Sequence, residues 1–317
     1  MTTPNGILLI RKEAGMTSHD VVNRLRRLYG TRQVGHTGTL DPMATGLLTL
    51  LIGRAVKASD YAMAERKRYV ARLRLGITTD TEDTTGQVLS RDGAIPSRDE
   101  VEAILPRFRG TILQIPPMVS AIKVGGEKLL DKARRGEVIE REARPIVIHR
   151  LTASPTDRAE EYELDVTCSK GTYIRTLCAD IGAALGCGGA MAALERVENG
   201  PHRLSEAVTL AEMDEMDEAA RLALLRPVEQ LFASSPILHL PPFFARLSHC
   251  GNPIYLKKLP ASAFLAPSGG ERLAAWPQVG ATVRLYDDGG FFAVGRIEEK
   301  EDGVVARMEK MMRVEGK

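Results

Sequence analysis

One carboxylate stands among glycines, small hydroxyl residues and a proline in the segment 35–46, which reads GHTGTLDPMATG. This acid is Asp41, and its nearest acidic neighbours in the sequence are Asp20 and Asp60. Glycines let a substrate approach the backbone closely because they carry no Cβ. Pro42 fixes its own φ and favours an extended conformation at Asp41. A stiffly held single acid in an open loop indicates chemistry on a large substrate; a turn with an Asx-type cap is the alternative.

Several reactions are excluded by the residues around Asp41. A phosphate-binding P-loop needs Gly-Lys-Ser/Thr, whereas this loop continues as Gly46-Leu47-Leu48. The spacing of Gly35, Gly38 and Gly46 is not that of a dinucleotide fingerprint, and no Gly-x-Ser-x-Gly elbow occurs. Glycoside hydrolysis normally uses two carboxylates, and this loop supplies one. A single carboxylate suits a reaction that attacks a nucleoside without releasing the base.

Positive charge is concentrated in the quarter of the chain that contains Asp41. Residues 1–75 hold 13 Lys and Arg against 5 Asp and Glu, although the whole chain has a net charge of only +2. This asymmetry favours a polyanionic partner such as nucleic acid, with a solvated basic face as the alternative. Between 123 and 150, 8 basic residues accompany 5 acids. We expect a mobile positive arm there, or a surface helix rich in ion pairs.

The elements that position Asp41 follow from periodicity and capping signals. Tyr69 to Leu75 alternates apolar and basic residues, which predicts a strand with Arg72 and Arg74 on its outer face. Thr17-Ser18 offers a cap for a helix that Gly30 ends. The other expected elements are a strand at 6–10, helices at about 19–29, 98–109 and 176–185, a basic helix end at 65–68, a strand at 162–168 and an acidic helical surface at 206–218.

The pattern of predicted elements changes near 234–236, which predicts a domain boundary. The residues after it contain short strand patterns, a turn at 287–290 and a strand at 291–297. A chain of 317 residues is about twice the usual domain size. We therefore expect an α+β catalytic domain at about 1–236 and a small β-rich module at about 237–317.

Cysteine usage and hydropathy predict a cytoplasmic protein. The four cysteines form no Cys-x-x-Cys pair and show no zinc-site spacing, which favours free thiols in a reducing compartment. Arg11, Lys12 and Glu13 interrupt the first apolar stretch, so no signal peptide is expected. The apolar run at 47–52 is far too short to span a bilayer.

The Asp41 segment resembles the catalytic motif of the TruB family of tRNA pseudouridine synthases. Further blocks occur in the family's order and extend the resemblance over roughly residues 6–200. They are Lys12 with Gly15-Met16-Thr17-Ser18, Lys67-Arg68-Tyr69, Gly76-x-x-Thr-Asp80-Thr, residues 115–123 (IPPMVSAIK), Arg144-Pro145 and residues 169–175 (SKGTYIR). The region 237–317 resembles the family's PUA-like RNA-binding module more loosely.

The resemblance implies a fold and a reaction. The fold would be that of the pseudouridine synthases, a mixed and mainly antiparallel sheet with the active cleft across its middle. The reaction would be isomerisation of the T-loop uridine at tRNA position 55, with no metal or organic cofactor. The implied partner is the tRNA T stem-loop, which the protein would bind as a monomer without a protein partner or a membrane.

The resemblance also assigns roles to residues. Asp41 would be the nucleophile, and Arg175 would pair with it and hold it ionised. Tyr69 would stack on the uracil and lie near the proton that leaves C5. Whether Asp41 attacks the sugar or the ring stays open at this point.

Three more residues are assigned to the base pocket in the same way. Tyr173 and Leu194 would line it, and His36 would fill the gap left by the extruded base. Without the resemblance, the tyrosines fit strand positions in a core, Leu194 fits a core residue, and His36 fits a hydrogen bond within its own loop.

The chain departs from the family's pattern at four positions near these motifs. Glu13 replaces a proline, Leu130 a tyrosine, Ala190 a histidine and Glu195 one of two basic residues. Three of these departures are expected on RNA-contacting surfaces. Two other functions stay open: a protein that chiefly binds and refolds tRNA, and an enzyme that modifies another RNA uridine, which the departures make conceivable.

Overall fold

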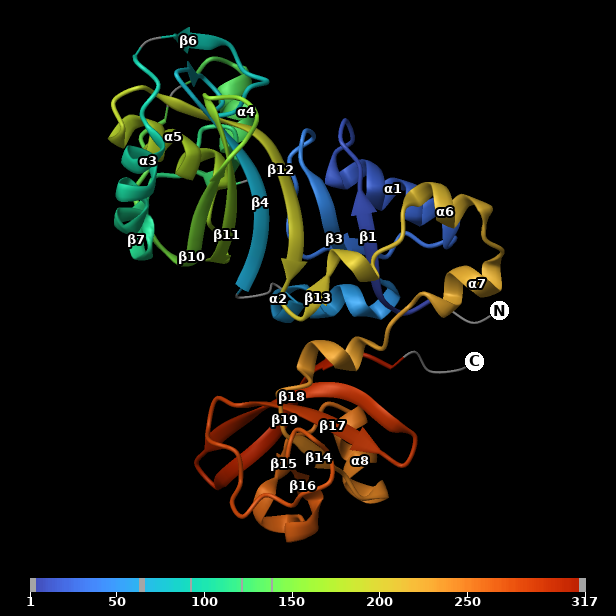
Figure 1. Cartoon of the computed structure of the whole chain (residues 1–317). Helices are drawn as coiled ribbons and strands as arrows, with labels where there is room; N and C mark the ends of the chain where they lie inside the picture. The colour runs from blue at the N-terminus through green and yellow to red at the C-terminus, as the bar shows by residue number, and fades with distance from the viewer. Residues whose placement is uncertain (1–3, 63–65, 92, 121, 138, 314–317) are drawn as a thin grey trace.

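A computed structural model describes residues 4–62, 66–91, 93–120, 122–137 and 139–313. The described part of the chain builds a large sheet from its N-terminal two thirds and a smaller sheet from its C-terminal third (Figure 1). Both sheets carry helices, and both chain ends emerge on the side where the two sheets meet (Figure 1).

The large sheet has nine strands within the described residues, with the main order β1-β3-β12-β4-β11-β10-β7. Every neighbouring pair is antiparallel except β3 and β12, which run parallel. The predicted mixed, mainly antiparallel sheet is therefore confirmed. The strands are β1 (Gly6–Lys12), β2 (Val34–His36), β3 (Thr45–Ile52), β4 (Arg66–Leu75), β7 (Gly110–Gln114), β10 (Arg144–Pro155), β11 (Glu161–Ser169), β12 (Gly189–Asn199) and β13 (His202–Arg203).

Three helices pack on one face of this sheet and close the main core. They are α1 (Ser18–Leu28), α3 (Arg98–Ile104) and α5 (Ile174–Ala184), whose apolar residues join those of the sheet in one buried cluster. Thr17 caps α1 in a reciprocal capping box with Asp20, as the sequence predicts. The remaining helical segments near this sheet are α2 (Ser59–Ala62), α4 (Leu129–Arg134), α6 (Leu210–Glu215), α7 (Glu218–Ala223) and short 3-10 turns.

Two segments differ from the sequence-based expectation. Residues 66–68 begin strand β4 and do not end a helix, because β11 and β12 supply ladder partners on both sides. In the expected arm, residues 123–128 form the short hairpin β8 (Lys123–Val124) and β9 (Glu127–Lys128), followed by α4. Arg135 pairs with Glu127 and Glu137 there, and residues from Arg144 onward already belong to β10.

The C-terminal sheet is built from β14 (Ile237–His239), β15 (Ile254–Tyr255), β16 (Phe264–Leu265), β17 (Thr282–Asp287), β18 (Gly290–Lys300) and β19 (Gly303–Met311). Helix α8 (Pro242–His249) packs against it. A second apolar cluster joins Ile7 and Leu51 of the large sheet to Phe232, Val294 and Met312. The two sheets therefore share a buried interface. Over the described residues, no helix has the length and apolarity needed to cross a membrane.

Gly46 closes the Asp41 loop where β3 meets β12. Its φ is +100°, and a Cβ there would lie 2.4 Å from the carbonyl oxygen of Arg196. We expect Gly46→Ala to lower the free energy of unfolding by about 3 kcal/mol, because the strained φ and the backbone clash act together. Gly15 also has a positive φ but open space around it, so Gly15→Ala should cost only about 1 kcal/mol. Urea denaturation of both variants tests this difference, and equal losses would contradict it.

Candidate active site

The loop that carries Asp41 lies between β2 and β3 and is fixed by residues of β1 and α1. Ser18 Oγ accepts from the N–H of Leu40 at 2.9 Å and donates to the carbonyl of Leu40 at 3.1 Å. Lys12 is fully buried, and its Nζ donates to the carbonyls of Met16 at 2.7 Å and Pro42 at 3.3 Å. Burial lowers the pKa of Lys12 to about 8, and the nearby Asp41 partly opposes that shift. The backbone on both sides of Asp41 is therefore anchored.

Arg175, at the start of α5, forms an ion pair with Asp41. Arg175 Nε lies 2.9 Å from Asp41 Oδ2, and Nη2 lies 3.4 Å from Oδ1. The Arg175 side chain is 4% exposed and that of Asp41 is 35% exposed. Arg175 also donates to the carbonyls of Thr81 at 3.0 Å and Val119 at 2.8 Å. A guanidinium held at four points fixes the orientation of a carboxylate that solvent and substrate still reach.

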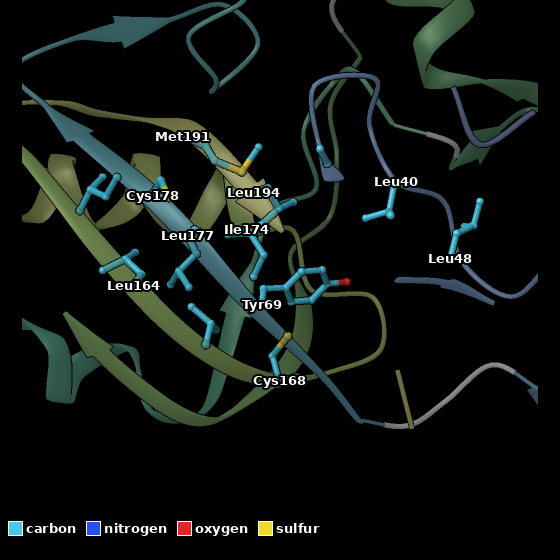
Figure 2. Close-up of a cluster of buried hydrophobic side chains, with 14 of the residues drawn as sticks. Leu40, Leu48, Tyr69, Leu164, Cys168, Ile174, Leu177, Cys178, Met191 and Leu194 are labelled. Carbon is cyan, nitrogen blue, oxygen red and sulfur yellow. The ribbon is translucent and has the colours of Figure 1, made fainter. Parts of the chain in front are cut away.

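A pocket of about 370 Å³ opens directly over this ion pair. Its wall includes Asp41, Lys67, Tyr69, Tyr173, Arg175 and Leu194. Figure 2 shows Tyr69 with its hydroxyl directed toward the side where Leu40 lies, and with Ile174 and Leu194 beside its ring. The structure thus brings five of the six predicted site residues to one pocket from positions more than 150 residues apart in the chain.

The two pocket tyrosines are held as neutral phenols. Burial raises the pKa of Tyr69 and that of Tyr173. Gln114 of β7 fixes the backbone of Tyr173. The Gln114 side chain accepts a hydrogen bond from Tyr173 N at 2.8 Å and donates one to Tyr173 O at 3.0 Å. Tyr69 is fixed by its place on β4, directly opposite Arg196 of β12. Both aromatic side chains therefore line the pocket that contains Asp41.

His36 is the predicted site residue that is not among the described residues lining this pocket. It ends β2, and its Nδ1 accepts a hydrogen bond from Gly38 N at 3.3 Å. Burial and the nearby Arg196 lower its pKa, so the ring is neutral at pH 7. His36 thus makes the hydrogen bond within its loop that the plain alternative predicts, and its role as a wedge stays a prediction.

A second carboxylate, that of Asp83, also lies near Arg175. Nothing in the sequence marked it as a site residue. Asp83 Oδ2 lies 3.9 Å from Arg175 Nε, and the Asp83 side chain is buried. Asp83 Oδ1 accepts from Thr81 Oγ1 at 2.9 Å and from Thr85 N at 3.0 Å. Asp83 does not line the pocket, so it is placed to orient Arg175 and not to act as a second catalytic acid.

Arg196 is a further buried residue that the sequence analysis passed over. Its Nε donates to the carbonyl of Leu47 at 2.7 Å, and its Nη2 donates to that of Gly38 at 3.0 Å. These two carbonyls lie on opposite sides of the Asp41 loop. Arg196 therefore holds both ends of the loop against β12.

The four departures from the family pattern have different surroundings. Ala190 is fully buried in β12, so it does not face RNA. Glu13 is exposed and Glu195 is half-buried. The side chain of Leu130 lies outside the described part of the structure.

Comparisons with known proteins show the family of this chain. Residues 26–174 match the model of the TruB family pseudouridylate synthase N-terminal domain, and residues 175–233 match that of the tRNA pseudouridylate synthase B C-terminal domain. A tRNA pseudouridine synthase B of Dechloromonas aromatica is 47% identical over 80% of this chain and 84% of its own length. One of Francisella tularensis subsp. novicida is 37% identical over 93% of this chain and 92% of its own length.

Solved structures show the same fold at lower identity. A Cbf5-Nop10-Gar1 complex contains a chain with a TM-score of 0.69 and 23% identity, which covers 98% of this chain and 86% of that one. The chain described here belongs to the TruB family of tRNA pseudouridine synthases. It is thus an isomerase that acts on uridine in tRNA.

The placement of Asp83 leads to a testable expectation. Asp83→Asn keeps the shape of the side chain but removes the charge that holds Arg175 from behind. We expect the single-turnover rate of pseudouridine formation to fall by about tenfold to 100-fold, with tRNA affinity unchanged, because Arg175 orients Asp41 less well. Asp80→Asn is the matched control, since Asp80 is exposed in the same loop and, among the described residues, its side chain accepts a hydrogen bond from the backbone N–H of Gln87. If Asp83→Asn forms pseudouridine as fast as Asp80→Asn, the expectation is wrong.

Proposed function

We propose that this protein converts the T-loop uridine at tRNA position 55 to pseudouridine, with Asp41 as the nucleophile. The observation that carries the proposal is the Asp41–Arg175 ion pair at the floor of the pocket, beside Tyr69. The names of the relatives support tRNA as the substrate. The excess of basic residues at 1–75 supports a polyanionic partner.

The size of the pocket favours base flipping. A volume of about 370 Å³ suits one nucleoside but not a stacked loop. The target uridine therefore leaves its stack to reach Asp41. In this proposal Tyr69 stacks on the uracil, Tyr173 and Leu194 complete the pocket, and His36 fills the space that the base leaves in the RNA.

The reaction needs a carboxylate held toward the substrate, and Arg175 orients Asp41 in this way. If the carboxylate attacks C1′ of the ribose, the C1′–N1 bond breaks and its electron pair stays with the uracil. The base then turns and C5 bonds to C1′, which releases the carboxylate. C5 loses its proton and N1 gains one, so the overall change is an isomerisation. If Asp41 adds instead to C6 of the ring, the electron pair of the C5–C6 double bond passes to the C4 carbonyl as an enolate before the bond to C1′ breaks. The base then turns, C5 bonds to C1′, loss of the C5 proton expels the carboxylate from C6, and N1 gains a proton. Both routes place negative charge on the uracil oxygens.

RNA binding is divided along the chain in this proposal. Residues 1–236 form the catalytic domain, the arm at about 117–150 contacts the T arm, and residues 237–317 form a PUA-like module. Recognition rests on the shape of the T arm and on phosphate contacts, because folded RNA exposes few base edges. The protein acts as a cytoplasmic monomer that binds tRNA without a protein partner.

Tritium release from RNA labelled at uracil C5 tests the proposal. Wild-type protein should release tritium from an isolated T stem-loop whose only labelled uridine corresponds to position 55. The anticodon stem-loop of the same tRNA, with one labelled uridine, is the matched control and should release none. Release from the control alone, or from neither RNA, would overturn the proposal.

A further inference from the structure

Lys67 lines the pocket, and its charge has no role in the mechanism above. Lys67 lies two residues before Tyr69 on β4, so both side chains leave the same face of the strand. Its side chain is half-buried, Lys67 and Gly38 both line the pocket, and Lys67 Nζ lies beside Gly38. The same wall holds Asp41 and Tyr69.

Arg196 brings a second cation to the same point. A Cβ built on Gly38 would lie 3.2 Å from Lys67 Nζ and 3.5 Å from Arg196 Nη1. Arg196 is fully buried, and its Nη1 is without a hydrogen-bond partner among the described residues. A buried guanidinium N–H without a partner is costly, so this atom offers an open donor position.

No ion pair within the described residues joins Lys67 or Arg196 to a carboxylate. The charged groups that act on Lys67 are Arg196 on β12 and Lys170 after β11, both positive. The thiol of Cys168 on β11 also faces Lys67, but burial raises its pKa to about 11, so it is neutral at pH 7. Burial and Arg196 lower the pKa of Lys67 to about 8, which leaves it protonated at pH 7. Among the described residues, no carboxylate forms an ion pair with the positive charge that Lys67 brings to the pocket wall.

We propose that the ammonium of Lys67 contacts a carbonyl oxygen of the flipped uracil and stabilises the negative charge that the base acquires when its bond to the ribose is broken. Arg196 is a positioning residue in this arrangement, because it holds Gly38 beside Lys67 and adds a fixed positive field. The inference rests on the proposed function. It adds Lys67 as a catalytic residue for the same reaction.

The position of Lys67 favours the base over the RNA backbone as its partner. The phosphodiester chain is continuous and stays at the mouth of a pocket that holds one nucleoside. Lys67 shares the wall with Tyr69, whose buried ring marks the inner part of the pocket. A preorganised donor at the oxygen where charge develops is worth about 10²- to 10³-fold in rate.

The test compares two substrates at pH 7 in single-turnover reactions. One tRNA transcript carries uridine at position 55 and the other carries 5-fluorouridine, whose electron-withdrawing fluorine itself stabilises the uracil anion. Consumption of the target nucleoside is measured by chromatography after nuclease digestion, because the fluorinated base has no C5 proton to lose. We expect Lys67→Met to lose about 100-fold with uridine but no more than about tenfold with 5-fluorouridine.

Two controls make this result decisive. Lys67→Arg keeps the positive charge and should stay within about tenfold of wild type on uridine. The affinity of Lys67→Met for tRNA should stay within about threefold of wild type, and its melting temperature should not fall, since it removes a desolvated charge. Equal losses on the two substrates, a loss explained by affinity, or a Lys67→Arg variant as slow as Lys67→Met would overturn the inference. A wild-type protein inactive on both tRNAs would instead overturn the proposed function.

Discussion

Asp41→Asn should lower the single-turnover rate of pseudouridine formation by about 10⁴-fold or more, while the affinity for tRNA should stay within about twofold of wild type. The substitution keeps the size of the side chain but removes the negative charge and the nucleophilic oxygen. Binding changes little, because RNA affinity comes mainly from contacts to phosphates over a wide surface. Rapid-quench assays and filter binding with the same tRNA transcript measure the two quantities.

This variant separates an enzyme from a protein that chiefly binds tRNA. Asp60→Asn is a suitable control, because Asp60 lies on α2 and does not line the pocket with Asp41. An Asp41→Asn protein that keeps a tenth or more of the wild-type rate would contradict the role of Asp41. A parallel loss of tRNA affinity and rate would show that Asp41 acts in binding.

Arg175→Met should remove activity to a similar extent and also destabilise the protein by about 3 kcal/mol. Arg175 is the cation that faces both Asp41 and the buried Asp83, and without it Asp83 keeps an unpaired charge in the interior. Urea denaturation and single-turnover assays measure the two losses. Arg24→Met is the surface control, since Arg24 makes an exposed ion pair with Asp214 and should cost less than about 1 kcal/mol.

A double variant separates the two roles of Arg175. In Arg175→Met/Asp83→Asn the buried charge is gone, so most of the lost stability should return. Activity should not return, because Asp41 still lacks its partner. Recovery of activity together with stability would show that Arg175 matters only for folding.

Much of the scaffold could be predicted from the sequence because its signals are local. The alternation from Tyr69 to Leu75 follows from a strand buried on one face, and the structure confirms it with Arg72 outside. The cap at Thr17 is likewise set by a few neighbouring residues. The start of β4 was harder to predict from the sequence, because residues 66–68 are all basic and become a strand only through pairing with β11 and β12.

The site was predictable only where motifs of a known family mark it. No periodicity indicates that Arg175 lies 2.9 Å from Asp41, 134 residues away in the chain. Asp83 and Arg196 were missed because charged residues are ordinarily expected at the surface, whereas both are buried here. Only the packed structure shows the carbonyls and the guanidinium that these two residues contact.

Mapping of pseudouridine in a full-length tRNA transcript tests the central claim most directly. The unmodified transcript is incubated with wild-type protein, and pseudouridine is located by chemical labelling and primer extension. We predict one pseudouridine, in the T loop at position 55, and none after incubation with Asp41→Asn. Folded wild-type protein that binds the transcript but forms no pseudouridine there, or forms it at another position, would contradict the account.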